Sequence, residues 1–199
     1  MQVNGHLLTL LVMPSEAPTR PTVRRLTTVT AAQQQALADV LIDCVAGGAS
    51  VSFLHPLSVN KALAFWQRVA DGVAQGERAL LVAEDAHGIV GTVQLVWDLP
   101  ENQPHRADLA KMLVHRRGRR QGVGEALMRA AESAARAQGK TLLMLDTTVG
   151  MDAERLYTRL GWVRYGEVPG HALLAHGGWS DTAFFYRALT ADPEVESNK

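Results

Sequence analysis

Cysteine is almost absent from this chain: of 199 residues only Cys44 is a cysteine. An intrachain disulfide is therefore excluded, and the chain suits a reducing compartment, so we expect a cytoplasmic protein. Cys44 lies within an apolar helical pattern, which favours a core residue over a catalytic nucleophile.

An excess of charge is absent too, because 20 Lys and Arg residues balance 20 Asp and Glu residues. Such a chain has no overall attraction to nucleic acid or to anionic membranes, so neither is expected as a partner. One basic cluster, 116–120, could still form an RNA-binding patch, but it lacks interleaved aromatic residues.

Long hydrophobic runs are also lacking. The apolar stretch 6–13 is far too short to span a membrane, and no Lys or Arg precedes it as in a signal peptide. Three prolines follow between Pro14 and Pro21. We expect residues 1–21 to be a flexible extension, residues 22–189 one domain, and residues 190–199 a polar tail.

Between these ends the hydrophobic patterns indicate alternating strands and helices, which predicts an α+β (mixed α/β) fold. Helices are expected from Thr28 or Thr30 to Gly47, from Leu57 or Ser58 to Gln75, and over 122–139 and 152–160. Strands are expected over 22–27, 78–84, 89–97, 107–115, 141–146, 162–168 and 182–188, the last two joined by a Gly/His-rich loop.

The most informative stretch joins an apolar strand, 109–114, to an Ala/Leu/Glu-rich helix through Arg119-Arg120-Gln121-Gly122-Val123-Gly124. A helix N-terminus offers unpaired N–H groups and a positive dipole end, which together favour a phosphate. The two glycines allow close backbone approach, and the two arginines add cationic donors. We interpret the stretch as a pyrophosphate cradle; the alternative is a basic surface turn that caps an ordinary helix.

The glycine spacing excludes two common phosphate loops. No Lys-Ser or Lys-Thr follows Gly124, as a Walker A loop requires, and the G-x-G-x-x-G spacing of a Rossmann turn is missing. The spacing Arg119-x-x-Gly122-x-Gly124 instead resembles the Gln/Arg-x-x-Gly-x-Gly/Ala signature of the GCN5-related N-acetyltransferases (GNAT).

That resemblance implies a central, mostly antiparallel twisted sheet of about seven strands flanked by helices, with strands 4 and 5 splayed. It also implies acetyl-coenzyme A as the acetyl donor, with its pyrophosphate on residues 119–124. Backbone groups of Met112, Leu113 and Val114 would pair with the pantetheine arm. A bulge there could point one N–H at the thioester oxygen and stabilise the charge that develops on it.

A second signature, 153–162, resembles the short GNAT helix that carries a tyrosine followed by Gly and an aromatic residue. The thiolate that leaves when an amine attacks the thioester needs a proton, and the Tyr157 hydroxyl could donate it. The alternative role for Tyr157 is packing of the helix on the sheet.

The amine must also lose a proton, which requires a base or an ordered water. Asp108 begins one of the two splayed strands and Asp146 ends the other, so both could face the acceptor amine. Each also has a structural alternative, Asp108 as a solvated strand end and Asp146 as a cap for the next turn.

Four short segments, 47–51, 105–112, 145–147 and 166–170, are similar to tabtoxin-resistance acetyltransferases, which acetylate small amine-bearing antimetabolites. That subfamily has Glu at the position of Asp108. The sequence therefore predicts an N-acetyltransferase that modifies a small polar amine, and this resemblance implies a role in small-molecule detoxification.

Two rival functions are kept, a protein or peptide acetyltransferase and a coenzyme-binding module without turnover. A homodimer is left open, and no metal site is expected, because the seven histidines show no H-x-x-x-H spacing. Ser50, Ser52, His55, His171 and His176 are noted as residues that could line an acceptor pocket.

Overall fold

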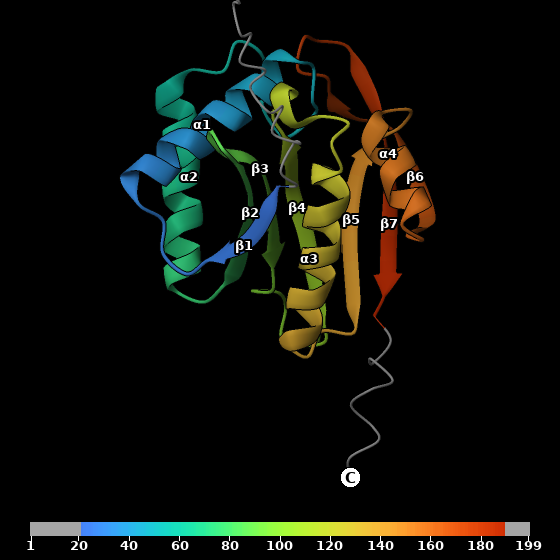
Figure 1. The fold of residues 1–199 in the computed structure, drawn as a ribbon. Coiled ribbons are helices and arrows are strands. Elements are labelled where there is room, and N and C mark those ends of the chain that lie inside the picture. Colours follow the sequence, from blue (N-terminus) through green and yellow to red (C-terminus); the bar gives the residue numbers. More distant parts are fainter. Residues whose placement is uncertain (1–20, 190–199) are drawn as a thin grey trace, which may run out of the picture.

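A seven-stranded sheet runs through the molecule, and the computed structural model describes residues 21–189 of it (Figure 1). The predictions for 1–21 and 190–199 fall, apart from Pro21, outside the described residues. The elements are β1 (Thr22–Leu26), α1 (Ala31–Ala46), α2 (Val59–Ala74), β2 (Arg78–Asp85), β3 (Gly88–Val96), β4 (Arg106–Val114), the 3₁₀ turn η1 (Arg116–Gly118), α3 (Val123–Ala137), β5 (Leu142–Thr148), α4 (Asp152–Arg159), β6 (Val163–Leu173) and β7 (Trp179–Ala188).

The strands lie in the order β1-β2-β3-β4-β5-β7-β6, and every neighbouring pair is antiparallel except β4 and β5. The predicted α+β class and mostly antiparallel sheet are therefore confirmed. The helix starts follow the sequence signals: Thr30 and Gln33 form a capping box at α1, and the Ser58 side chain accepts from Lys61 N at α2.

The sequence of β2 is apolar without alternation because both of its faces are buried. Ala79, Leu81 and Ala83 pack in the cluster formed with α3 and α4. Leu80 and Val82 belong to the cluster formed with α1 and α2. Helices thus cover both faces of this part of the sheet, so both side-chain rows of the strand are buried.

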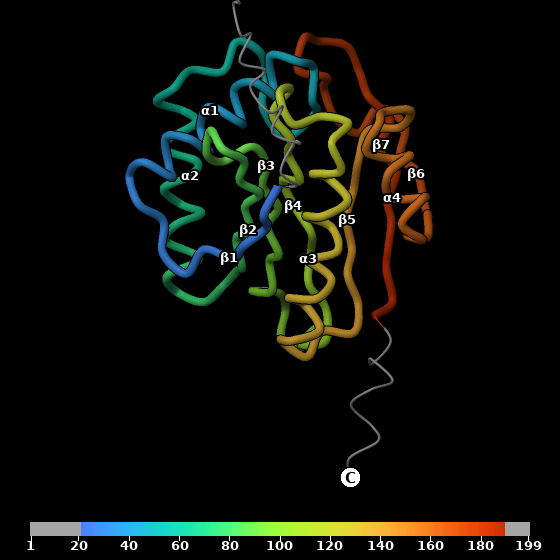
Figure 2. The backbone as a smooth tube through the Cα atoms, in the orientation of Figure 1, coloured from blue at the N-terminus to red at the C-terminus, as the bar shows by residue number. Residues whose placement is uncertain are grey.

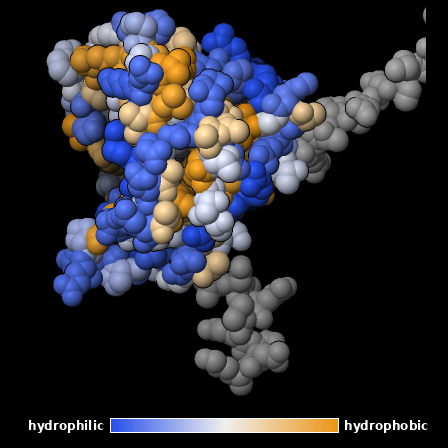
Figure 3. Space-filling view, turned by 90° about the vertical axis from the view of Figure 1, so that its left-hand side faces the viewer, coloured by the Kyte–Doolittle hydropathy of each residue, from blue (hydrophilic) through white to orange (hydrophobic). Residues whose placement is uncertain are grey.

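Seen from the side of α1 and α2, the surface is a mixture of hydrophilic and hydrophobic patches (Figure 3).

The end of the chain differs from expectation. The Gly/His-rich loop predicted between the last two strands is mostly strand, because β6 continues to Leu173 and β7 begins at Trp179. The pairing register shifts between Val168 and Ala172, which interrupts the alternation that reveals a strand in a sequence. Gly170 N there donates to the Asp181 side chain of β7 at 2.8 Å.

The hairpin of β6 and β7 reaches across to the segment that joins α1 and α2. His55 N donates to Ala175 O at 2.7 Å, and the ring centroids of His55 and His176 are 4.7 Å apart. Figure 2 shows these two segments, far apart in sequence, side by side at the upper end of the molecule. They close one end of the sheet above β4 and β5.

Gly91 in β3 supports a stability prediction. A Cβ at this position would lie 2.9 Å from Leu113 O and 3.0 Å from Val123 Cγ1. Because the backbone of β4 cannot yield easily, we expect Gly91→Ala to lower the free energy of unfolding by about 1–3 kcal/mol in urea denaturation.

The matched control is Gly166→Ala in β6, where a Cβ meets no atom within 4 Å and φ is not left-handed. We expect that variant to keep the wild-type stability. Equal stabilities of the two variants would contradict the packing assigned to Gly91.

Candidate active site

The site is built around the point at which β4 and β5 stop pairing. Their parallel register covers Arg106–Asp108 against Leu142–Met144, and β4 then continues to Val114 without β5 as a ladder partner. The register of β4 against β3 also shifts between Thr92 and Gln94, so that β4 carries a bulge at 111–112. A bulge bends its strand, and here it accompanies the divergence of β4 from β5.

Lys111 occupies this bulge with a left-handed φ of 51°. The backbone of Met112, Leu113 and Val114 therefore follows the bulge along the open edge, as the pantetheine assignment requires. Their side chains are core residues: Leu113 is buried with α1 and α2, and Met112 and Val114 pack against the α3 cluster.

The predicted cradle follows β4 and consists of a turn with two left-handed residues, Arg120 at φ 60° and Gly122 at φ 79°. α3 then begins at Val123, and Gly122 supplies no side chain to cap it. The first backbone N–H groups of α3 are therefore open to a ligand, and a Cβ at Gly122 would meet no protein atom within 4 Å. Gln121 stabilises the turn by donating from Nε2 to Arg117 O at 2.7 Å.

Most arginines of the basic cluster are engaged by the protein itself. Arg116 pairs with Asp43, Arg117 pairs with Asp85 at 3.1 Å, and Arg119 Nε donates to Val114 O at 3.3 Å. Arg120 makes no hydrogen bond or ion pair within residues 21–189. Arg120 is thus the arginine of this cluster best placed for a phosphate, while Arg119 fastens the turn to the end of β4.

Gly124 has a structural reason to be glycine. A Cβ there would lie 3.1 Å from Leu156 Cδ2, so the close approach of α3 and α4 favours a residue without a side chain. Close backbone approach to a phosphate, the reason inferred from the sequence, therefore has a packing reason beside it.

Tyr157 lies on α4 and is only 4% exposed. Its ring contacts Trp162 and Phe185 at centroid distances of 6.1 and 6.0 Å. Burial raises the pKa of the phenol far above its usual value, and the charge of Asp146 adds to this. The hydroxyl therefore keeps its proton at neutral pH, as a proton donor must. The packing role and the acid role are compatible in this geometry.

The two predicted carboxylates interact but occupy different surroundings. Burial raises the pKa of Asp108, Arg106 at 3.2 Å opposes that rise, and the charge of Asp146 reinforces it. Asp146 itself is exposed and lines a cavity. The structure therefore brings the pair close enough to interact, with Asp108 deeper and Asp146 in contact with the cavity.

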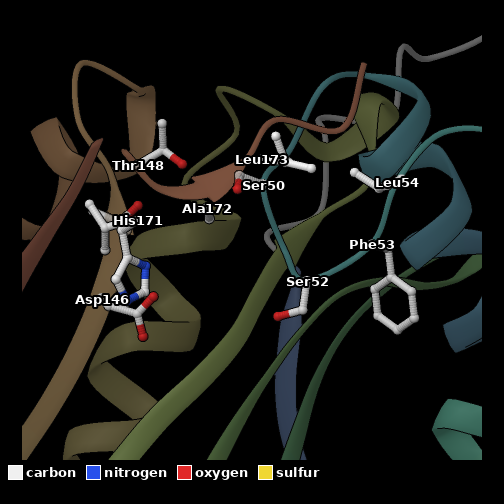
Figure 4. Close-up of a pocket in the computed structure, with 11 residues that line it drawn as sticks. Ser50, Ser52, Phe53, Leu54, Asp146, Thr148, His171, Ala172 and Leu173 are labelled. Atoms are coloured by element: carbon white, nitrogen blue, oxygen red, sulfur yellow. The ribbon is translucent and has the colours of Figure 1, made fainter. Parts of the chain in front are cut away.

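That cavity, of about 320 Å³, lies between the end of β5, the segment joining α1 and α2, and the β6–β7 hairpin (Figure 4). Asp146 and His171 lie on one side of it and Ser52 and Phe53 on the other. Its lining residues are Ser50, Ser52, Phe53, Leu54, Asp146, Thr147, Thr148, His171, Ala172, Leu173 and Thr182.

Of the side chains noted in the sequence, Ser50, Ser52 and His171 line the cavity, whereas His55 and His176 do not. Those two rings pack on each other, and His176 Nε2 lies 3.2 Å from Ala46 O. Lys111 was missed as a site residue. Its Nζ donates to Ser52 Oγ at 3.1 Å. The available signal was a single lysine within an otherwise apolar strand.

Two further observations concern metal sites and membrane-spanning helices. Within residues 21–189 no group of three or more His, Cys, Asp or Glu side chains is arranged to hold a metal ion. None of the helices in that part of the chain is long and apolar enough to cross a membrane.

Comparison with known proteins gives a family match over part of the chain. The family model described as an acetyltransferase (GNAT) domain matches residues 76–164, a segment that includes the bulge, the cradle and Tyr157. The match covers less than half of the chain. The GNAT fold that the sequence predicted is confirmed by this match and by the solved structures that share the fold.

A curated relative is similar to part of this chain. Human N-acetyltransferase 8 is 36% identical over 88 residues, which are 43% of this chain and 39% of that protein. The chain thus matches well under half the length of that curated relative.

Two solved structures share the fold at lower identity. A phosphinothricin acetyltransferase from Sinorhizobium meliloti in complex with acetyl-CoA has a TM-score of 0.70 and 19% identity, over 88% of this chain and 91% of that one. A ribosomal-protein-alanine N-acetyltransferase from Brucella melitensis has a TM-score of 0.69 and 22% identity, over 84% and 99%. Proteins of this fold are thus named for different acceptors.

Gly122 supports a prediction on the cradle. Gly122→Val places a branched side chain in front of the open N–H groups of α3. We expect it to weaken acetyl-CoA binding by about tenfold or more, equivalent to roughly 1.4 kcal/mol, in calorimetric titration.

Gly139→Val is the matched control, because Gly139 also has a left-handed φ, 69°, and open space for a Cβ, but lies beyond the other end of α3. Both variants carry similar backbone strain, so a loss of affinity confined to Gly122→Val reports the ligand. Gly122→Ala serves if the valine variant fails to fold. Unchanged affinity in a folded Gly122 variant would remove the cradle assignment.

Proposed function

We propose that this chain is an acetyl-CoA-dependent N-acetyltransferase that acetylates the amine of a small polar molecule. The observation that carries the proposal is the opening between β4 and β5. It has an anion cradle at the start of α3 and a carboxylate-lined cavity at the end of β5. Such an opening can hold a donor on one side and an acceptor on the other.

The residues of the opening fit acetyl-CoA as the cosubstrate. The turn 120–122 and the first N–H groups of α3 would hold its pyrophosphate, and the bulged edge of β4 would hold its pantetheine arm. Acetyl-CoA, when bound, supplies an activated acetyl group as a thioester. The acetyl-CoA complexes among the structural neighbours support this assignment.

The chain's own groups then have distinct tasks. A carboxylate in the cavity attracts the ammonium form of the acceptor, and Asp146 or Asp108 takes its proton directly or through water. A backbone N–H of the β4 bulge stabilises negative charge on the carbonyl oxygen. Tyr157 donates a proton to the departing sulfur.

The size and walls of the cavity favour a small acceptor over a peptide. Residues 50–54 and 171–173 close it from two sides, and five hydroxyl-bearing residues among its walls suit a polar ligand. A toxin-like antimetabolite, as in the tabtoxin-resistance type, is one acceptor within this proposal, and the phosphinothricin enzymes among the neighbours support that class. A cytoplasmic location and a homodimer remain predictions.

A screen of small amines tests the function directly. Release of coenzyme A is measured for each amine, and amide formation is verified by mass spectrometry. We expect at least one small polar amine to be acetylated well above the rate of hydrolysis. If acetyl-CoA binds but only peptides are acetylated, the peptide function replaces this one; if nothing is acetylated, the coenzyme-binding module does.

Tyr157→Phe tests the proposed acid. The variant keeps the buried ring and removes one proton donor, so we expect kcat to fall by roughly ten- to a thousandfold, with acetyl-CoA affinity nearly unchanged. Single-turnover kinetics ensures that chemistry is measured.

Tyr165→Phe removes the same hydroxyl from an exposed residue on β6 and should leave kcat at the wild-type value. If Tyr157→Phe turns over as fast as Tyr165→Phe, the phenol is only a packing group.

Replacing Asp108 should lower activity without lowering stability. Because the folded-state pKa of Asp108 is raised, its contribution to stability is present at acidic pH and lost as pH rises through that pKa. Asp108→Asn should therefore keep or increase the melting temperature at pH 7. At the same time, kcat/KM for a cationic acceptor should fall by roughly tenfold or more.

Asp146→Asn should lower kcat/KM similarly, and the double variant should lose less than the sum if the pair acts as a unit. A base role further predicts that the acidic limb of the pH–rate profile moves in one single variant. Glu84→Gln is the control, because Arg24 holds the pKa of Glu84 below its usual value and Glu84 does not line the cavity. It should lower stability at pH 7 and leave the kinetics unchanged. Wild-type kinetics in both Asp variants would make the carboxylates structural.

A further inference from the structure

Three residues of the 21–189 segment adopt a left-handed φ without being glycine: Ser52 at 70°, Lys111 at 51° and Arg120 at 60°. A side chain in this conformation costs roughly 1–2 kcal/mol, which glycine would avoid. Strained positions of this kind persist where a side chain has a use. Arg120 belongs to the cradle, and the other two residues contact each other.

Lys111 and Ser52 meet across the opening from different elements, Lys111 from the β4 bulge and Ser52 from the segment joining α1 and α2. Lys111 Nζ donates to Ser52 Oγ at 3.1 Å, and Ser52 lines the cavity. A neutral hydroxyl satisfies one N–H bond of the ammonium and leaves its charge without a counterion in direct contact. Neither residue has another hydrogen bond or ion pair within the described chain.

The surroundings of Lys111 disfavour the charged form of its side chain. Burial lowers the pKa of its ammonium group, and the charge of Asp146 only partly opposes this. Asp146 lies in the cavity opposite Ser52 (Figure 4). The cavity therefore has Asp146 on one side and, on the other, Ser52, whose hydroxyl accepts from the Lys111 ammonium group.

We propose that Lys111 and Ser52 form an anion subsite of the acceptor cavity, so that the acceptor is a small zwitterion with an acidic group beside its reactive amine. The acidic group would accept from Lys111 Nζ and Ser52 Oγ, while the ammonium faces Asp146. A cavity of about 320 Å³ accommodates a molecule with the size of an amino acid. This inference rests on the proposed function, because it describes the acceptor of that reaction.

The alternative role of Lys111 is to compensate the charges of Asp108 and Asp146 without contacting the acceptor. The two roles differ in what a neutral side chain would change. A compensating lysine repels any ammonium ligand, so its removal would strengthen the binding of every amine. An anion subsite affects only those ligands that carry an acid.

The test uses matched probe pairs that differ by one carboxylate: L-methionine and 3-(methylthio)propylamine, L-phenylalanine and phenethylamine, and L-lysine and cadaverine. Each is titrated by calorimetry into the protein saturated with coenzyme A, so that binding is read without turnover. We expect at least one acid to bind the wild type roughly ten- to a hundredfold more tightly than its partner, as a charge-assisted hydrogen bond provides.

Lys111→Met should abolish that preference by weakening the acid and not the amine, and Lys111→Arg should restore part of it. Ser52→Ala should reduce the preference less. Lys61→Met is the matched control, since the exposed Lys61 Nζ lies 5.8 Å from the ring centroid of Phe53, a residue of the cavity wall. It should leave the preference intact. Circular dichroism verifies that each variant is folded.

The inference is overturned if no acid is preferred by the wild type, or if a folded Lys111→Met variant keeps the preference. Turnover separates this failure from failure of the proposed function. Acetylation of an amine without an acid preference retains the enzyme and removes the anion subsite. Binding of the acids without any acetylation retains the subsite and removes the enzyme.

Discussion

β4 and β5 are held together over only three residue pairs, Arg106–Asp108 against Leu142–Met144, and the candidate site depends on that limit. On its other edge, each strand has a pairing partner for its backbone N–H and C=O groups. β4 pairs with β3 as far as Val114, and β5 pairs with β7 along its whole length. Divergence therefore leaves only one edge of each strand without a partner. Those edges supply main-chain donors and acceptors to whatever enters between them.

The rest of the fold keeps this opening from closing. α3 packs on one face of the sheet and α1 and α2 on the other, so β3 and β4 are clamped from both sides. α4 packs against β5, and Gly124 lets α3 and α4 approach closely beside the opening. A ligand bound there would meet a preformed cavity, which limits the conformational entropy lost on binding.

Electrostatics divide the opening into regions with different chemistry. The α3 N-terminus and Arg120 are positive, Asp108 and Asp146 are negative, and Lys111 is a cation between the strands. The other arginines near the cradle are paired with Asp43 and Asp85 or bound to a carbonyl. The charge that a ligand meets is thus much smaller than the basic run 116–120 suggests.

The sequence by itself determined the fold class, the order of the elements and the position of the glycine turn before α3. These depend on local signals: a capping Thr or Ser, a glycine that tolerates left-handed φ, and an apolar period of two or of three to four. The Gly/His-rich end of β6 was misjudged as a loop for the same reason, because a bulge removes the period.

Only the tertiary structure decided which side chains face one another. Lys111 and Ser52 are 59 residues apart, and their contact requires both the β4 bulge and the segment joining α1 and α2. Packing between distant segments also places Asp146 at the cavity, and it sets the rings of His55 and His176 against each other outside the cavity. Such contacts leave no periodic trace in a sequence, since they depend on where whole elements lie and not on the residues beside them.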